Sequence, residues 1–215
     1  MTSPIPIIAL DVPTLADARA LVARVGPAAD FFKVGLQLYT REGPPVVEWL
    51  RGEGKRVFLD LKLHDIPNTV GRAAASAAAL GVDLLTVHAV GGEAMLRAAV
   101  EGAREGGAST GILAVTVLTS FDDAAYAAAT LNPGIRAAYA VAQYAAVAAR
   151  AGARGVVCAG AEAAAVRRAH GEGFGTLVPG LRAAGATWVV VGRMVTAAAD
   201  PAAAFAGAAA ALRGA

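Results

Sequence analysis

Short apolar runs alternate with longer alanine-rich runs along the whole chain. The short runs place apolar residues in consecutive positions, a pattern typical of parallel strands that are buried on both faces. They predict eight strands, at Ile5–Asp11, Phe31–Val34, Val57–Lys62, Leu84–His88, Ile112–Leu118, Gly155–Cys158, Thr176–Val178 and Trp188–Val191. The alanine-rich runs predict helices at Leu15–Arg24, Pro44–Arg51, Thr69–Leu80, Ala94–Glu105, Ile135–Ala151, Ala161–His170 and Pro201–Arg213, the last with Asp200 as its N-cap.

Strands that alternate with helices in a chain of 215 residues predict an α/β fold, a (β/α)8 TIM barrel at the small end of its size range. The competing fold is a doubly wound open sheet, in which a glycine-rich turn follows the first strand. The sequence at that point, Leu10-Asp11-Val12-Pro13, is not such a turn. No linker or break in composition divides the chain, so residues 1–215 are expected to form a single barrel domain.

The seventh unit does not fit this pattern. Only nine residues lie between Val178 and Trp188, whereas a crossover between parallel strands needs about a dozen or more, usually with a helix. The segment from Leu181 to Thr187 cannot supply that helix. Either the seventh unit is abnormal, or a segment that belongs after Arg182 is missing from this sequence. We favour the second interpretation and expect a further loop there.

Composition excludes several classes of protein. Hydrophobic residues make up 56% of the chain and charged residues 17%, which favours a large core over disorder. Lys and Arg number 19 against 17 Asp and Glu, and they form no basic stripe, so no nucleic-acid partner is expected. No apolar stretch reaches the roughly 18 residues of a membrane span, and no basic region precedes the first apolar run, so we expect no membrane association and a cytoplasmic location. The single cysteine, Cys158, rules out an intrachain disulfide, and no residues have zinc-ligand spacing, so no metal is expected.

The densest group of polar residues is Asp60-Leu61-Lys62-Leu63-His64-Asp65. In a barrel the functional face is formed by the carboxyl ends of the strands. Asp60 and Lys62 are two residues apart and point to the same side of their strand, where Lys33 of the neighbouring strand can reach them. The chain has only three lysines, so a lysine in an apolar strand indicates chemistry that a guanidinium cannot do. The alternative is a structural cluster of ion pairs that caps the barrel.

A second candidate site follows the last two strands, at Pro179-Gly180 and Gly192-Arg193. Loops in these positions bind phosphate in many barrels, through backbone N–H groups. An arginine there can hold a phosphate with two parallel hydrogen bonds. The alternative is an ordinary turn followed by a surface charge.

The segment from Phe58 to Thr69, Phe-Leu-Asp-Leu-Lys-Leu-His-Asp-Ile-Pro-Asn-Thr, closely resembles the signature of the orotidine 5′-phosphate decarboxylase family. The shorter Asp-x-Lys-x-x-Asp pattern is shared with sugar-phosphate enzymes, whereas the His-Asp-Ile-Pro-Asn-Thr continuation is particular to this family. Further segments that resemble the family follow in order, at Ala9–Asp11, Phe32–Gly35, Val115–Ser120, Val178–Arg182 and Val190–Arg193.

The resemblance implies a cofactor-independent decarboxylation of orotidine 5′-monophosphate to UMP and CO2. It implies that Lys62 stabilises and then protonates the C6 carbanion. Asp60 is expected beside the departing carboxylate, and Asp65 is expected to complete the charge network from the partner subunit of a homodimer. Lys33 belongs to the same catalytic group and, with Asp11, is expected to contact the ribose hydroxyls.

The remaining substrate contacts are also implied by the resemblance. Thr69 is expected to act from across the dimer interface, and Thr119 to lie at the pyrimidine. Arg182, Gly192 and Arg193 are expected on the phosphate side. Members of the family have a longer loop after the position of Arg182, with a glutamine that grips the phosphate, and this sequence has no counterpart of it.

Two other functions remain open at this point. One is a related barrel enzyme that acts on a keto-sugar phosphate with a divalent metal held by the acidic residues. The other is a catalytically inactive barrel that binds nucleotides or serves as a scaffold. Sensitivity to a chelator separates the first from the decarboxylase, and release of CO2 separates the second.

Overall fold

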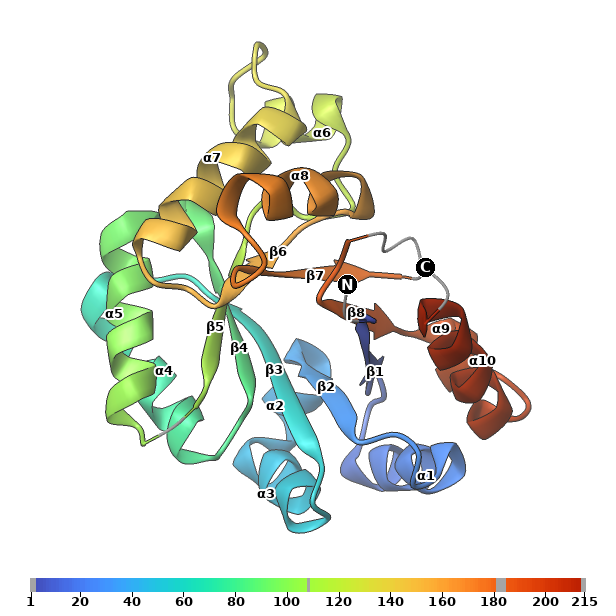
Figure 1. The fold of residues 1–215 in the computed structure, drawn as a ribbon. Helices are drawn as coiled ribbons and strands as arrows, with labels where there is room; N and C mark the ends of the chain where they lie inside the picture. Colours follow the sequence, from blue (N-terminus) through green and yellow to red (C-terminus); the bar gives the residue numbers. More distant parts are fainter. Residues whose placement is uncertain (1–2, 108, 181–184, 214–215) are drawn as a thin grey trace.

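Eight parallel strands form a closed barrel in which each strand pairs with its neighbours in chain order (Figure 1). This computed structural model describes residues 3–107, 109–180 and 185–213. Pairing of β1 with β8, from Ile5 opposite Trp188 to Ile8 opposite Val191, closes the barrel. The strands are β1 (Ile5–Ala9), β2 (Phe31–Gly35), β3 (Arg56–Leu63), β4 (Leu84–His88), β5 (Gly111–Val115), β6 (Gly155–Val157), β7 (Gly175–Pro179) and β8 (Trp188–Val191). The predicted TIM barrel is therefore confirmed.

The helices surround the barrel (Figure 1). They are α1 (Leu15–Val25), α2 (Leu36–Glu42), α3 (Pro44–Gly52), α4 (Pro67–Ala79), α5 (Gly92–Glu105), α6 (Asp123–Ala129), α7 (Ala137–Arg150), α8 (Gly160–His170), α9 (Arg193–Thr196) and α10 (Pro201–Arg213), with a short 3-10 turn at Ala89–Gly91. The short helices α2, α6 and α9 were not predicted from the sequence. Each has seven residues or fewer, too few to show a clear helical period, and isolated helices of this length are unstable without tertiary packing.

The core has two layers, which follow from the alternation of side chains along each strand. Inward-facing residues such as Phe31, Phe58 and Leu84 fill the barrel interior. Outward-facing residues such as Leu59 and Leu85 belong to the larger cluster that also includes the buried helix residues. On β3, therefore, Phe58 faces inward, and Asp60 and Lys62 continue the inward-facing row toward the carboxyl end.

The last helix begins where the sequence predicts. The carboxylate of Asp200 accepts a hydrogen bond from the backbone N–H of Ala203 at 3.0 Å, just before Pro201 begins α10. This is the predicted N-cap. Two predicted strands end two or more residues earlier than expected, at Ala9 and at Val115, and in both cases residues that follow the strand line the cavity described below.

The connection from β7 to β8 is short. Eight residues, 180–187, join the two strands, and those of them that the structure describes form no helix. A fully extended chain of this length spans about 26 Å, more than the roughly 17 Å that it must return along β7. At its end, Thr187 donates its backbone N–H to the Thr176 carbonyl, and the Thr187 carbonyl accepts the Ile5 N–H, both at 2.9 Å. Eight residues are therefore enough to connect the end of β7 with the start of β8.

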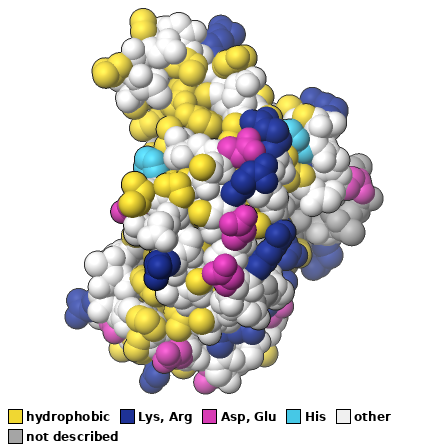
Figure 2. Space-filling model, turned by 90° about the vertical axis from the view of Figure 1, so that its left-hand side faces the viewer, with side chains coloured by type: hydrophobic (Ala, Val, Ile, Leu, Met, Phe, Trp, Pro, Cys, Tyr) yellow, Lys and Arg dark blue, Asp and Glu magenta, His cyan; other side chains and the backbone are white. Residues whose placement is uncertain are grey.

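The surface on the side of α5 carries charges of both signs. Figure 2 shows neighbouring positive and negative side chains in alternation over this side. Glu93 of α5, for example, pairs with Arg97 on the same helix and with Arg150 of α7. Within the described parts of the chain, none of the helices combines the length and the apolar character that crossing a membrane requires.

Candidate active site

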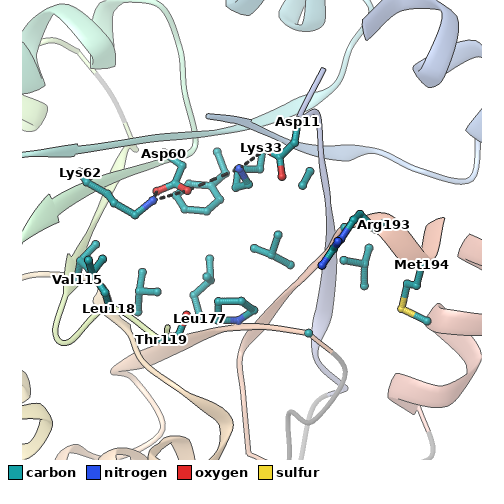
Figure 3. Close-up of a pocket in the computed structure, with 18 of the residues that line it drawn as sticks. Asp11, Lys33, Asp60, Lys62, Val115, Leu118, Thr119, Leu177, Arg193 and Met194 are labelled. Carbon is teal, nitrogen blue, oxygen red and sulfur yellow. Dashed lines mark hydrogen bonds and ion pairs between the residues drawn. The ribbon is translucent and has the colours of Figure 1, made fainter. Parts of the chain in front are cut away.

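A cavity of 510 Å³ opens at the carboxyl ends of the strands. Its charged side chains come from two directions, with Asp11, Lys33, Asp60 and Lys62 along one side and Arg193 at one end (Figure 3). Most of the other lining residues are apolar. They include Phe58, Val115, Val117, Leu118, Val157, Leu177, Val190 and Met194. A row of charges therefore faces a hydrocarbon wall, a setting in which electrostatic interactions are stronger than in water.

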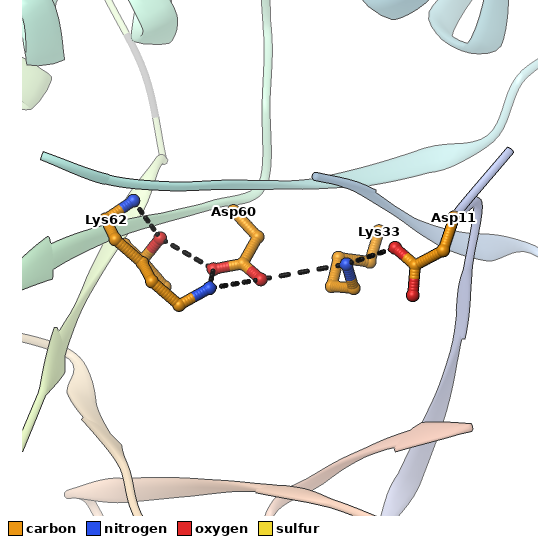
Figure 4. Close-up of polar contacts among 5 residues, drawn as sticks. Asp11, Lys33, Asp60 and Lys62 are labelled. Carbon is orange, nitrogen blue, oxygen red and sulfur yellow. Dashed lines mark hydrogen bonds and ion pairs between the residues drawn. The ribbon is translucent and has the colours of Figure 1, made fainter. Parts of the chain in front are cut away.

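Four charged side chains from three strands or strand ends form a continuous row (Figure 4). The Lys62 ammonium contacts both carboxylate oxygens of Asp60, at 2.8 and 2.9 Å. Asp60 Oδ2 lies 3.7 Å from the Lys33 ammonium, which in turn donates to Asp11 Oδ1 at 2.9 Å. Positive and negative groups thus alternate, as the sequence predicts for the first three residues, and the structure adds Asp11 to the row.

The inner part of this row is shielded from solvent. The side chains of Lys33 and Asp60 are 11% and 13% exposed, and that of Lys62 is 30% exposed. At about 4 Å and an effective dielectric constant near 20, two opposite charges attract each other by about 4 kcal/mol. The free energy cost of removing both charges from water opposes this attraction. The contacts with Asp60 therefore hold the Lys62 ammonium in one place on the charged side of the cavity.

The backbone at Lys62 adopts an unusual conformation. Its φ angle is +50°, in the left-handed region that side chains with a Cβ atom rarely adopt. The pairing of β3 with β4 shifts register between Leu59 and Leu63, so Lys62 lies in a β-bulge. Backbone strain of this kind costs about 1–3 kcal/mol and persists only where the surrounding contacts enforce it.

Three expected site residues line the far parts of the cavity. Thr119 follows β5, and Gly192 and Arg193 follow β8. Figure 3 shows the Arg193 guanidinium pointing toward the cavity, opposite the end occupied by Lys62. Gly180 also lines the cavity, with a φ of +88°. A cation and two glycines therefore meet beyond β7 and β8, as the sequence predicts for a phosphate site.

Two expected site residues lie outside the cavity of the single chain. Asp65 and Thr69 are exposed and do not line it. The Asp65 carboxylate instead accepts the backbone N–H of Ile66 at 2.6 Å. Arg182 falls outside the described residues.

Sequence reasoning missed one residue of this site, Thr86. It is fully buried on β4, and its hydroxyl oxygen is 2.9 Å from both the Lys62 backbone nitrogen and Asp60 Oδ1. The available signal was a hydroxyl at an inward position of the otherwise apolar run Leu84–Val87.

Two other titratable groups near the strand ends have shifted pKa values. Burial, with the neighbouring charges of His64 and Lys62, lowers the pKa of His88 below its usual value, and Asp60 opposes this effect. Burial, with a smaller contribution from Glu162, raises the pKa of the Cys158 thiol to about 12, so the thiol stays protonated and unreactive. Among the residues that the structure describes, no three or more His, Cys, Asp or Glu side chains are grouped to hold a metal ion.

Comparison with known proteins identifies relatives over nearly the whole chain. The family model described as "Orotidine 5'-phosphate decarboxylase / HUMPS family" matches residues 4–208. The orotidine 5′-phosphate decarboxylase of Anaeromyxobacter dehalogenans is 48% identical over 91% of this chain and 92% of its own. That of Thermobifida fusca is 46% identical over 99% of this chain and 97% of its own.

Solved structures show the same similarity in three dimensions. The crystal structure of orotidine 5′-phosphate decarboxylase from Lactobacillus acidophilus superposes with a TM-score of 0.89 at 34% identity. The match covers 98% of this chain and 99% of that one. An uncharacterized conserved protein from Geobacillus kaustophilus gives the same TM-score at 39% identity, over 96% of this chain and 99% of its own.

Proposed function

The chain belongs to the orotidine 5′-phosphate decarboxylase / HUMPS family and decarboxylates orotidine 5′-monophosphate to UMP in pyrimidine biosynthesis, and we propose that Lys62 is its catalytic residue. The observation that carries this proposal is the Lys62 ammonium, held 2.8 Å from Asp60 at the edge of a largely apolar cavity. A fixed cation in such a place stabilises negative charge that develops beside it without having to reorganise.

The proposed step needs no electron acceptor. The bond between C6 and the carboxylate carbon breaks, its electron pair stays on C6, and CO2 leaves. Lys62 Nζ then transfers one proton to C6, which gives UMP, and the neutral amine regains a proton from water. The sum is orotidine 5′-monophosphate plus one proton giving UMP and CO2.

The neighbours of Lys62 support this role. Asp60 contacts the ammonium with both oxygens, and we assign it to the place beside the departing carboxylate of the substrate. Repulsion between these two carboxylates would raise the energy of the bound substrate. Lys33 and Asp11 continue the charged row, and we assign them to the ribose hydroxyls.

The other end of the cavity suits the phosphate. We assign Arg193 and the backbone at Gly192 to the phosphate group, because a guanidinium binds phosphate with two parallel hydrogen bonds. Thr119 lies on the wall between the two ends and is assigned to the pyrimidine. Arg182, two residues after Gly180 in the sequence, is assigned to the phosphate on the basis of the family resemblance alone.

We further propose that the active enzyme is a homodimer in which each subunit contributes Asp65 and Thr69 to the cavity of its partner. Large apolar side chains are exposed around the mouth of the barrel, each shortly after the end of a strand: Leu36, Ile66, Val90 and Met194, each 50–65% exposed. Exposed apolar side chains at one end of the barrel favour contact with a second copy over that face. Asp65 and Thr69 are exposed on this face, where they can reach a partner's cavity.

The missing segment after Arg182 remains part of the proposal. The alignment with the Thermobifida fusca relative runs over 233 residues, more than the whole of this chain, so that relative has residues without counterparts here. We propose that they belong after Arg182, where the β7–β8 connection is short. An intact mass of the natural protein above the 21.4 kDa of these 215 residues would support this, and a mass of 21.4 kDa would contradict it.

The single buried cysteine supports a cytoplasmic location.

Replacement of the lysine tests the proposed role. Lys62→Ala removes both the cation and the proton donor, each worth about 10²–10⁴-fold, so we expect decarboxylation to slow by at least about 10⁴-fold. Lys55→Ala is the matched control, because the Lys55 ammonium binds the Ala29 carbonyl away from the cavity. Activity is followed by UMP formation and folding by circular dichroism. A folded Lys62→Ala variant with near-normal turnover would end the proposal.

Mixing of two inactive variants tests the shared site. Lys62→Ala and Asp65→Ala subunits are each expected to be inactive as homodimers, whereas a mixed dimer would contain one site with both native residues. Random mixing is therefore expected to restore about a quarter of the native activity. If the mixture stays inactive although subunits exchange, Asp65 does not act across the interface.

A chelator separates this reaction from the metal-dependent alternative. Decarboxylation through Lys62 is expected to continue unchanged in excess EDTA, whereas a reaction that needs a divalent metal held by the acidic residues would stop. Tight UMP binding without any CO2 release would favour the inactive nucleotide-binding barrel instead.

A further inference from the structure

The bulge in β3 interrupts the pairing of two neighbouring strands beside the cavity. Leu59 lies opposite Leu85 and Leu63 lies opposite Val87. Three residues of β3 therefore face a single residue of β4, which is Thr86. The Lys62 backbone N–H is one of the donors that this irregularity removes from the regular ladder, and a buried donor needs another acceptor.

The Thr86 hydroxyl supplies that acceptor. Its oxygen accepts the Lys62 N–H at 2.9 Å and donates to Asp60 Oδ1 at 2.9 Å. A carboxylate can only accept, so the hydroxyl hydrogen points to Asp60 and its lone pair is free for Lys62. Thr86 is fully buried, so water does not compete for either bond.

These contacts form a closed ring that begins and ends on one residue. The Lys62 backbone donates to Thr86, Thr86 donates to Asp60, and Asp60 accepts the Lys62 ammonium at 2.8 Å (Figure 4). The ring fixes both the left-handed backbone of Lys62 and the carboxylate that orients its side chain. Thr86 is the uncharged member of this ring, and it pairs in regular register with Leu113 of β5.

We infer that Thr86 is a positioning residue for the reaction: its hydroxyl sets the location of the Lys62 ammonium through the Lys62 backbone and through Asp60. The inference rests on the proposed function of Lys62. Since Thr86 is absent from the residues that line the cavity, its loss should affect the chemical step more than the binding of substrate. Electrostatic catalysis depends on groups that are already in place before the reaction.

Three variants test this inference. Thr86→Val keeps the shape and removes the hydroxyl, and we expect kcat to fall about 10- to 100-fold, the equivalent of one hydrogen bond to a charged group, with KM changed by less than about threefold. Thr86→Ser keeps the hydroxyl and is expected to restore kcat to within about threefold of the native value. Thr110→Val is the matched control, because its hydroxyl binds the Val82 carbonyl just before β5 begins, at the opposite end of the barrel, and it should leave kcat and KM unchanged.

The outcomes separate this inference from the proposed function. If the native protein releases no CO2, the proposed function fails first. If the native protein is active, the inference is overturned by a native kcat in Thr86→Val, by a loss confined to KM, or by equal losses in Thr86→Val and Thr86→Ser. If Thr86→Val does not fold, Thr86→Ala removes the same hydroxyl without adding a methyl group in its place and carries the same expectations.

Discussion

Substitution of Lys62 by glycine should give a more stable protein than substitution by alanine, the reverse of the usual order. Both variants lose the same ammonium and leave Asp60 with the same neighbours, Lys33 and Thr86. Only the backbone preference of the new residue differs between them. At φ +50° a residue with a Cβ atom is strained by about 1–2 kcal/mol, whereas glycine is not.

The magnitude follows from two opposing terms. Relief of strain favours glycine, and the greater freedom of glycine in the unfolded chain opposes it by about 0.5–1 kcal/mol. We therefore expect Lys62→Gly to exceed Lys62→Ala in free energy of unfolding by about 0.5–1 kcal/mol. With a urea slope near 2 kcal/mol per molar, the midpoint shifts by about 0.3–0.5 M.

Lys33 provides the matched comparison, because it is another lysine of the same charged row and has a negative φ angle. There the unfolded-state term acts alone, and Lys33→Ala should be more stable than Lys33→Gly by about 0.5–1 kcal/mol. Equilibrium urea unfolding, followed by circular dichroism and fitted with a common slope, measures all four variants. The same order at both positions would show that the backbone of Lys62 is not held in the left-handed conformation.

Two further predictions concern packing and pH. A Cβ at Gly155 would clash with the backbone oxygen of Gly175 on the next strand, so Gly155→Ala should lower stability by about 3 kcal/mol. Gly207→Ala, with open space in α10, should raise stability by about 0.5–1 kcal/mol. Equal thermal unfolding temperatures for the two variants would contradict this. The pKa of His88 is lower in the folded than in the unfolded protein, so between these two pKa values the unfolded chain binds more protons. Stability therefore falls as the pH drops from the usual pKa of histidine to the lower pKa of the folded protein. His88→Gln should reduce that loss between about pH 7 and 5, and an unchanged pH dependence would refute it.

The fold could be predicted because each strand carries its own signal. Trp188–Val191 is apolar throughout and Leu84–His88 is apolar apart from Thr86 and His88, and the structure gives these two strands the predicted bounds. The sequence-based predictions miss helices where tertiary packing, and not the local sequence, decides the secondary structure. The seven residues of α2 and of α6 owe their place to contacts such as those of the buried side chains Leu38 and Tyr126, which no local pattern reveals.

The site was predictable in part for the same reason. Spacing along β3 places Asp60 and Lys62 on one side, and the strand order brings Lys33 next to them. The register shift opposite Thr86 could not be predicted, because a bulge depends on the pairing of two strands and not on either sequence alone. The roles of Asp65 and Thr69 stay predictions, since a single chain holds no partner.

Most of the wall opposite the charged row offers only hydrocarbon to a ligand. Val115, Val157, Leu177 and Val190 come from four different strands, and none of their side chains can donate or accept a hydrogen bond. A ligand that turns a hydroxyl or amino group toward them gives up its water and receives nothing in exchange, a loss of about 1–3 kcal/mol for each group. On this side the barrel therefore discriminates among ring systems because it provides no hydrogen-bond partner. Inhibitors should bind best when the ring edge that faces this wall carries no polar substituent.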